Sequence, residues 1–365
     1  MLFNLIFCVE FIWQEQMHHF RGLISKLTPS SASEGRLKKE QYYLKNGSAV
    51  LEELIALCDG KSRIPLRYFS AIEIERAIEH SEKPLYTYGR HMVKGLLDKR
   101  FVLVSFTYDT YDICRDIAIT SQMSHLKNVL KLIGCCLEYA EPVLVYEYVE
   151  AITLHDLLFR KDYYYNHARN LSLSWESRLQ IANEIASAIL YLHSEFTTPI
   201  IYIDLHLQKV LIDQSSGVAK LFDFSLSISL PPGELEVEAQ VVRGTCGYLD
   251  PEYARLGIVT QKTDVFGFGV ILFQLLTGKR MYIVNDEMRD LCNASNIEEC
   301  SIMDIVDPAI LEENGIEIRQ QLEDYLDLAK RCTLSNGEDR PYMIHVAKEI
   351  RRIEKCFRAL TQGLN

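Results

Sequence analysis

The chain has 365 residues, of which 48% are hydrophobic and 24% charged, enough to bury a large core in one two-lobed domain or in two separate ones. Its formal net charge of −11 argues against nucleic acid or an anionic membrane as the main partner, because either would need a basic face. The ten cysteines are scattered without CxxC spacing, which predicts reduced thiols of a cytoplasmic protein and excludes the usual zinc motifs.

The N-terminal stretch 1–13 is apolar but contains Glu10. It is too short to span a bilayer and lacks the basic region and cleavage site of a signal peptide, so we expect no transmembrane segment. Three interpretations stay open: an amphipathic extension, a true start at Met17, or an anchor on a membrane surface. Downstream, a helical segment follows a Ser-rich turn, and we expect a partly helical extension over 1–64. The apolar stripe of that helix is predicted to hold Leu51, Leu54, Ile55 and Leu57.

A small α/β unit is predicted over 65–147. Ser70 has the position of a helix N-cap, and Glu73 three residues later completes a capping box. Alternating and β-branched runs then predict strands on both sides of one further helix. These elements are strands over 85–106 with a turn at 95–99, a helix over 113–123, and strands within 129–137 and 142–148.

The rest of the chain, 148–360, has the pattern of a larger helical lobe. Ser174 is placed to cap one long helix, and the run 264–276 is almost uniformly apolar, as expected of a central buried helix. A small β-rich lobe, a hinge strand and a helical lobe together predict an α+β fold with two lobes.

Two acids flank a predicted β-hairpin in 200–224. Asp204 follows the first apolar run, and Asp223 ends the last one. Carboxylates on neighbouring loops could serve as a base and a metal ligand. However, His206 and Lys209 stand between them, and a lysine so close competes with a divalent cation for the same charges.

Two segments carry a resemblance to a known family. The sequence GTCGYLDPEY at 244–253 resembles the end of a kinase activation segment, and TDVFGFGV at 263–270 resembles the central helix of the large kinase lobe. From about residue 67 to 357 the chain thus resembles a protein kinase domain of the plant receptor-like type. The resemblance implies that Asp264 orients the catalytic loop and that Arg340 pairs with Glu252.

The resemblance also shows where the chemistry of a kinase has changed. Phosphoryl transfer needs glycines at the phosphates, a strand lysine paired with a helix acid, and acidic and amide ligands for magnesium. Here Leu85, Thr87 and Arg90 stand near the three glycine positions. The other altered positions are Ser105 for the lysine, Asp116 for its helix partner, Ile203 for the arginine before Asp204, His206 and Lys209 for the catalytic-loop lysine and asparagine, and Ser225 for the glycine that should follow Asp223-Phe224.

We therefore expect Asp204 and Asp223 to be retained for structure, with Asp204 bonded within its own loop and Asp223 paired with Lys209. No metal site and no cofactor are expected. Weak ATP binding at the hinge, and rescue by another lysine such as Lys94, stay open. The hinge contacts would be Glu147, Tyr148 and Val149.

Within the kinases, the extension 42–62 followed by 67–78 is similar to cytoplasmic receptor-like pseudokinases of plant immunity. Proteins of that kind hold a nucleotide-binding leucine-rich-repeat immune receptor and recruit or mimic other receptor-like kinases. The resemblance implies a catalytically inactive adaptor or decoy in the cytoplasm, reaching the plasma membrane only through its partners. Its acidic and apolar activation segment, 225–242, is a further candidate docking surface. The alternatives are a pseudokinase that still binds nucleotide and a weakly active Ser/Thr kinase.

Overall fold

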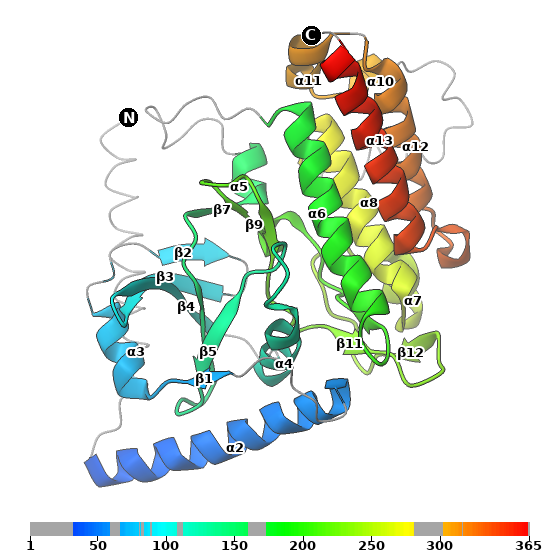
Figure 1. Cartoon of the computed structure of the whole chain (residues 1–365). Coiled ribbons are helices and arrows are strands. Elements are labelled where there is room, and N and C mark those ends of the chain that lie inside the picture. Colours follow the sequence, from blue (N-terminus) through cyan, green and yellow to red (C-terminus); the bar gives the residue numbers. More distant parts are fainter. Residues whose placement is uncertain are drawn as a thin grey trace, which may run out of the picture.

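A computed structural model describes residues 32–58, 66–79, 81, 84–87, 90–107, 112–159, 173–280, 302–315 and 317–363. An N-lobe is built on one mixed β-sheet and a C-lobe on long helices, as Figure 1 shows. The predicted two-lobed α+β architecture is confirmed. The apolar N-terminal stretch 1–13 lies outside the described residues.

The N-lobe sheet has six strands in the order β1-β5-β6-β4-β3-β2, antiparallel except for β1 beside β5. Its hairpin turn is Asp98-Lys99, and both residues have positive φ, as a tight two-residue turn between twisted strands requires. The predicted turn at 95–99 was therefore too wide, because β3 continues to Leu97. The strands are β1 (Arg67–Tyr68), β2 (Pro84–Thr87), β3 (Arg90–Leu97), β4 (Arg100–Thr107), β5 (Leu132–Cys136) and β6 (Val143–Glu147).

Helices α3 (Ala71–Ile78) and α4 (Ile113–Met123) cover opposite faces of this sheet. The predicted capping box of α3 is confirmed, since Ser70 and Glu73 exchange their hydrogen bonds. Valines of β3, β4 and β6 pack against α3, whereas Met92 and Leu103 on the other face pack with α4 and with residues of the C-lobe. The second face is therefore the one turned toward the C-lobe.

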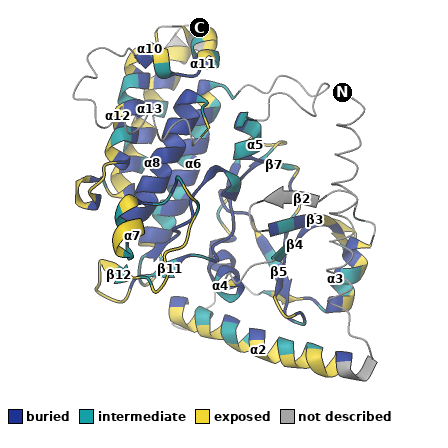
Figure 2. Cartoon of the chain, turned by 180° about the vertical axis from the view of Figure 1, so that it is seen from behind, coloured by how far each residue is buried: buried dark blue, intermediate teal, exposed yellow. Residues whose placement is uncertain are grey.

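Helix α2 (Ala32–Cys58) packs against α4 at the edge of the N-lobe (Figures 1 and 2). It is held by buried Val50 and Leu57, and by Asn46, whose side-chain amide donates to the carbonyls of Leu137 and Tyr139 at 3.0 and 2.9 Å. The predicted helix is confirmed, but its predicted stripe was partly wrong. Leu51 and Ile55 are exposed, because the helix has two apolar faces and the face with Val50 and Leu57 is the one that packs against the N-lobe.

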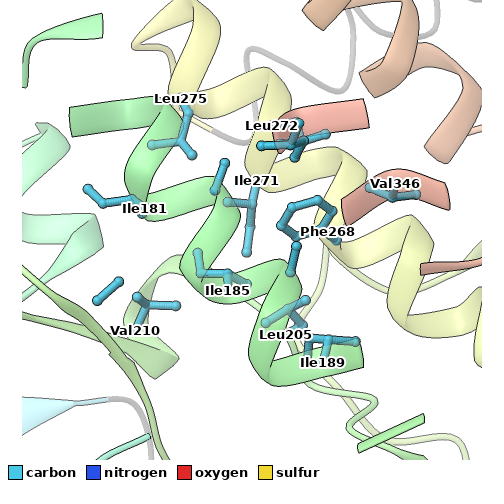
Figure 3. Packing of buried hydrophobic residues seen from close by; sticks show 14 of the residues in the cluster. Ile181, Ile185, Ile189, Leu205, Val210, Phe268, Ile271, Leu272, Leu275 and Val346 are labelled. Carbon is cyan, nitrogen blue, oxygen red and sulfur yellow. The ribbon is translucent and has the colours of Figure 1, made fainter. Parts of the chain in front are cut away.

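The C-lobe is centred on α8, which is buried along almost its whole length, as predicted. Figure 3 shows Phe268, Ile271 and Leu272 of α8 between Ile185 of α6 and Val346 of α13. The helices are α5 (Leu154–Phe159), α6 (Trp175–Ser194), α7 (Pro251–Leu256), α8 (Gln261–Thr277), α10 (Ile302–Ile305), α11 (Pro308–Asn314), α12 (Arg319–Cys332) and α13 (Met343–Gly363), with short 3₁₀ turns η1 (Leu207–Lys209) and η2 (Gly337–Asp339).

Short strands line the N-lobe side of the C-lobe. Strands β9 and β10 form the predicted hairpin, but the first apolar run, β8, pairs with β11 instead, so the predicted hairpin was one strand too long. Among the described residues, no helix is both long and apolar enough to cross a bilayer. The strands are β7 (Ala151–Thr153), β8 (Ile200–Ile201), β9 (Val210–Asp213), β10 (Ala219–Leu221), β11 (Ile228–Ser229), β12 (Glu236–Glu238) and β13 (Ile258–Thr260).

Candidate functional site

The loop after β8 is organised by Asp264 in the first turn of α8. Its carboxylate accepts from the backbone amides of Tyr202 and Ile203 at 2.9 and 2.8 Å, and it lies 2.7 Å from Nε2 of His193. Ile203 has a φ of +71°, which is costly for a β-branched residue. Asp264 therefore orients the loop, as the resemblance implied, and its hydrogen bonds hold Ile203 in a strained conformation.

Asp204 accepts its shortest hydrogen bond, 2.7 Å, from Thr245 Oγ1. The predicted contacts from its own loop are present in His206 and Lys209, but Thr245, which lies 41 residues further along the chain, was not predicted. From its own loop, His206 Nε2 and Lys209 Nζ approach within 3.5 and 3.8 Å. Burial by itself raises the pKa of the Asp204 carboxyl, but His206, Lys209 and Thr245 outweigh burial and lower it.

Asp223 is held by two cations. Lys209 Nζ forms the predicted ion pair with one carboxylate oxygen, and Arg90 Nη2 lies 2.7 Å from the other. Ser225, in the place of the expected glycine, donates its hydroxyl to the same carboxylate at 2.6 Å. Burial raises the pKa of Asp223, but the charges of Arg90 and Lys209 outweigh burial and hold it well below its ordinary value.

Arg90 is the residue that the sequence did not identify as part of the site. Its Nη2 bridges Asp223 and Asp116, whose Oδ2 lies 2.5 Å away, and all three side chains are fully buried. In the sequence, Arg90 stood out only as a bulky residue near a glycine position. A signal was available: Arg90 and Met92 alternate along β3, and the inward side of that strand faces two acids that need a counter-charge.

Asp116 connects α4 to the chain after β10. In addition to Arg90, it accepts hydrogen bonds from Thr120 Oγ1 at 2.8 Å and from the backbone amide of Phe224 at 2.9 Å. Burial raises the pKa of Asp116 more than the charge of Arg90 lowers it. Arg90 is therefore the counter-ion on which the ionised form of Asp116 depends.

The sheet face turned toward the C-lobe is apolar. Its Met92 and Leu103 belong to one buried cluster with Val149 after β6, Leu211 of β9 and Phe222 after β10. Ser105 is buried on the same sheet, and its hydroxyl has no hydrogen-bond partner within the described part of the chain. Strand β4 thus offers no cation to a phosphate at this position.

The three predicted hinge residues, Glu147, Tyr148 and Val149, contact other parts of the chain. Glu147 accepts from Lys220 Nζ at 2.8 Å, and Val149 is buried. Tyr148 is exposed and lies near Lys94, whose Nζ is 3.8 Å above the ring of Phe101 and 4.7 Å above that of Tyr148. Lys94 therefore stacks on aromatic rings at the hinge instead of contacting Asp204 or Asp223.

Glu252 and Arg340 do not form the predicted ion pair, because each of them contacts another residue. Arg340 Nη2 lies 2.7 Å from Asp250, whereas Glu252 accepts the backbone amide of Gly337 at 2.9 Å. Asp250 is the N-cap of α7, and its Oδ1 accepts both the backbone amide of Glu252 and Arg340 Nη2. Both contacts still tie α7 to the segment before α13.

The activation segment, residues 225–242, is partly ordered by a strand. Glu236–Glu238 form β12 beside β13, with Val237 paired to Val259. Leu235, Val241 and Val242 remain exposed, in agreement with the expected surface of acidic and apolar residues. Whether anything docks there stays a prediction.

The β-rich N-lobe, the acid Asp116 on α4, the two loop aspartates Asp204 and Asp223, and the central helix α8 are arranged as in a protein kinase. A model of the protein kinase domain matches residues 99–350, and the chain belongs to the protein kinase family. Among its relatives from Arabidopsis thaliana, the serine/threonine-protein kinase ZRK4 is 38% identical over 354 residues, 87% of this chain and 94% of that protein. The non-functional pseudokinase ZED1 is 37% identical over 350 residues, 88% and 99% of the two chains. The non-functional pseudokinase ZRK2 is 35% identical over 337 residues, 88% and 92%.

Proposed function

We propose that this chain is a pseudokinase that transfers no phosphate and acts as an adaptor through protein partners. The observation that carries the proposal is the pairing of Asp223 with both Arg90 and Lys209. In a working kinase the equivalent acid is a magnesium ligand. Here the carboxylate is already paired with two buried cations, which would repel a divalent ion at the same place.

Further losses support the proposal. Ser105 brings no charge to the place of the phosphate-binding lysine, and Lys209 replaces an amide ligand of the metal. Removing a single charge-stabilising donor typically costs about 10²–10³-fold in rate, so several such losses would bring transfer near background even if they are far from additive. We propose accordingly that the cleft takes no Mg·ATP in a productive form.

Transfer is tested with labelled ATP and magnesium or manganese, with Asp204→Asn as the matched control. We expect equal, background labelling of both proteins. Labelling of the wild type that disappears with Asp204→Asn would overturn the proposal. This outcome has to be tested because the relative ZRK4 is named a kinase. Nucleotide binding without transfer is tested by thermal shift, since a ligand at 100 times its Kd stabilises by about 2.7 kcal/mol. We expect no shift at millimolar Mg·ATP.

The adaptor role draws support from the outer face of α2. Leu37, Leu44, Leu51 and Ile55 lie on one side of the helix, opposite Val50 and Leu57, and all four are more than half exposed. Exposed leucines aligned over about five helical turns are typical of a protein-binding surface. We propose that the partners are an intracellular nucleotide-binding leucine-rich-repeat immune receptor and other receptor-like kinases, in the cytoplasm, with plasma-membrane attachment only through them.

This part of the proposal is tested by co-expression with such a receptor. Leu44→Glu on α2 should abolish co-purification, whereas Leu334→Glu, which changes an exposed leucine on the C-lobe, should leave it intact. Equal retention of the receptor by both variants would exclude α2 as the contact.

A further inference from the structure

Helix α2 is joined to the start of the activation segment through one arginine of α4. Glu53 on α2 forms a two-pronged ion pair with Arg115, with 3.0 Å from Oε1 to Nη2 and 3.1 Å from Oε2 to Nε. The remaining terminal nitrogen of Arg115, Nη1, donates to the backbone carbonyl of Ser227 at 3.0 Å. A single guanidinium therefore contacts two segments that are far apart in the sequence.

The neighbour of Arg115 strengthens the same connection. Asp116 accepts the backbone amide of Phe224, so two successive residues of α4 hold the chain at Phe224 and Ser227. Arg115 is fixed in turn by the N-cap of α4, because its backbone amide donates to Asp112 at 3.0 Å. The start of the activation segment is thus positioned by the first turn of α4.

Helix α2 also packs against two apolar clusters. Val50 belongs to the cluster of the N-lobe, Leu57 belongs to the cluster that joins α4 to the C-lobe core, and Leu54 packs against both. Since α2 is anchored at these points, and at Asn46, it fixes the place of α4 between the lobes. Any change in how α2 is seated would act on Arg115 first.

We infer that α2 is a strap that sets the position of the activation segment through the relay Glu53–Arg115–Ser227. Arg115 is a positioning residue in this relay. The inference deepens the proposed adaptor function, and it rests on that function only for the identity of a partner. A protein bound to the exposed apolar face of α2 would alter the position of the segment from Ser225 onward. The relay itself is a property of the isolated chain.

The test is hydrogen exchange of the full chain without any partner. Two amides report on the segment, since Ser227 donates to Phe224 O at 3.0 Å and Leu230 donates to Pro199 O at 2.9 Å. Glu53→Gln keeps the shape of the side chain and removes its charge. We expect it to speed exchange over 225–230 by about fivefold, the lower end of the range for coupled sites. Glu52→Gln, at the exposed neighbouring position, should leave the rate unchanged.

A double-mutant cycle completes the test. Arg115→Gln should speed exchange over 225–230 as much as or more than Glu53→Gln, and the double variant should be no faster than Arg115→Gln alone. Melting temperatures confirm that each variant is folded. The inference is overturned if Glu53→Gln matches Glu52→Gln, or if its effect is confined to α2. Neither outcome touches the proposed lack of phosphate transfer or receptor binding, which are measured separately.

Discussion

Replacing Arg90 by methionine should destabilise the protein more than any other single change in the cleft. The variant keeps a side chain of similar length, but it leaves Asp116 without its cation and Asp223 with Lys209 alone. Removing one partner of a fully buried ion pair typically costs about 3–5 kcal/mol. Arg100→Met on β4, which changes an exposed arginine at the surface, should cost less than about 0.5 kcal/mol.

The pH dependence of this loss identifies its cause. Burial already raises the pKa of Asp116, and without Arg90 that pKa rises further. An acid whose folded pKa is raised destabilises the protein only when it is ionised. The loss of folding free energy is therefore absent below the ordinary pKa of about 3.9, grows as the pH rises toward the pKa of the folded state, and is complete above that pKa. Each unit by which the folded-state pKa exceeds the ordinary one contributes about 1.36 kcal/mol to this loss. The destabilisation by Arg90→Met should be smaller at pH 5 than at pH 8.

Urea unfolding at both pH values measures the free energy of unfolding of wild type, Arg90→Met and Arg100→Met. Adding Asp116→Asn to Arg90→Met should recover part of the loss at pH 8, because it removes the unpaired charge. The reasoning is refuted if Arg90→Met costs less than about 1 kcal/mol, or if its cost is the same at the two pH values.

Two further experiments probe the packing of the two lobes. Gly134→Ala should cost about 1–3 kcal/mol in urea unfolding, because its Cβ would lie 2.0 Å from the backbone oxygen of Arg67 in β1; a cost near zero would mean that β1 is not held there. Burial raises the pKa of Cys332 to about 12, so at pH 8 iodoacetamide should label exposed Cys246 in the native protein and Cys332 only after unfolding, as mass spectrometry would show. Labelling of both thiols at equal rates would contradict the described core.

Local signals in the sequence were enough for the elements. The capping box at Ser70 and Glu73 and the apolar run of α8 depend on residues a few positions apart, and both were predicted correctly. The stripe of α2 was not, because a helix with apolar residues on two sides gives no indication of which side docks. Leu51 and Ile55 face outward although they follow the same period as Leu54, which packs inward.

The site itself depends on contacts that no short window contains. Arg90 and Asp223 are 133 residues apart, and their pairing requires the two lobes to meet. The motif register identified the changed residues at 105, 116 and 209, and the pairing of Lys209 with Asp223 was predicted, whereas Ser105 and Asp116 were interpreted only as losses. The structure shows that Lys209 and Asp116 belong to one ion-pair network with Asp223, and Arg90 of β3 lies at its centre.

The retained acids can be explained without catalysis. Asp264 holds the backbone of Tyr202 and Ile203, Asp204 holds Thr245, and Asp223 joins Lys209 to Arg90. In a nucleotide-bound kinase, the strand lysine, the metal and the phosphates connect the helix acid to the aspartate before the phenylalanine. Here one guanidinium makes that connection directly. The contact between α4 and the start of the activation segment is therefore made by groups of the chain itself, which agrees with the proposed adaptor function.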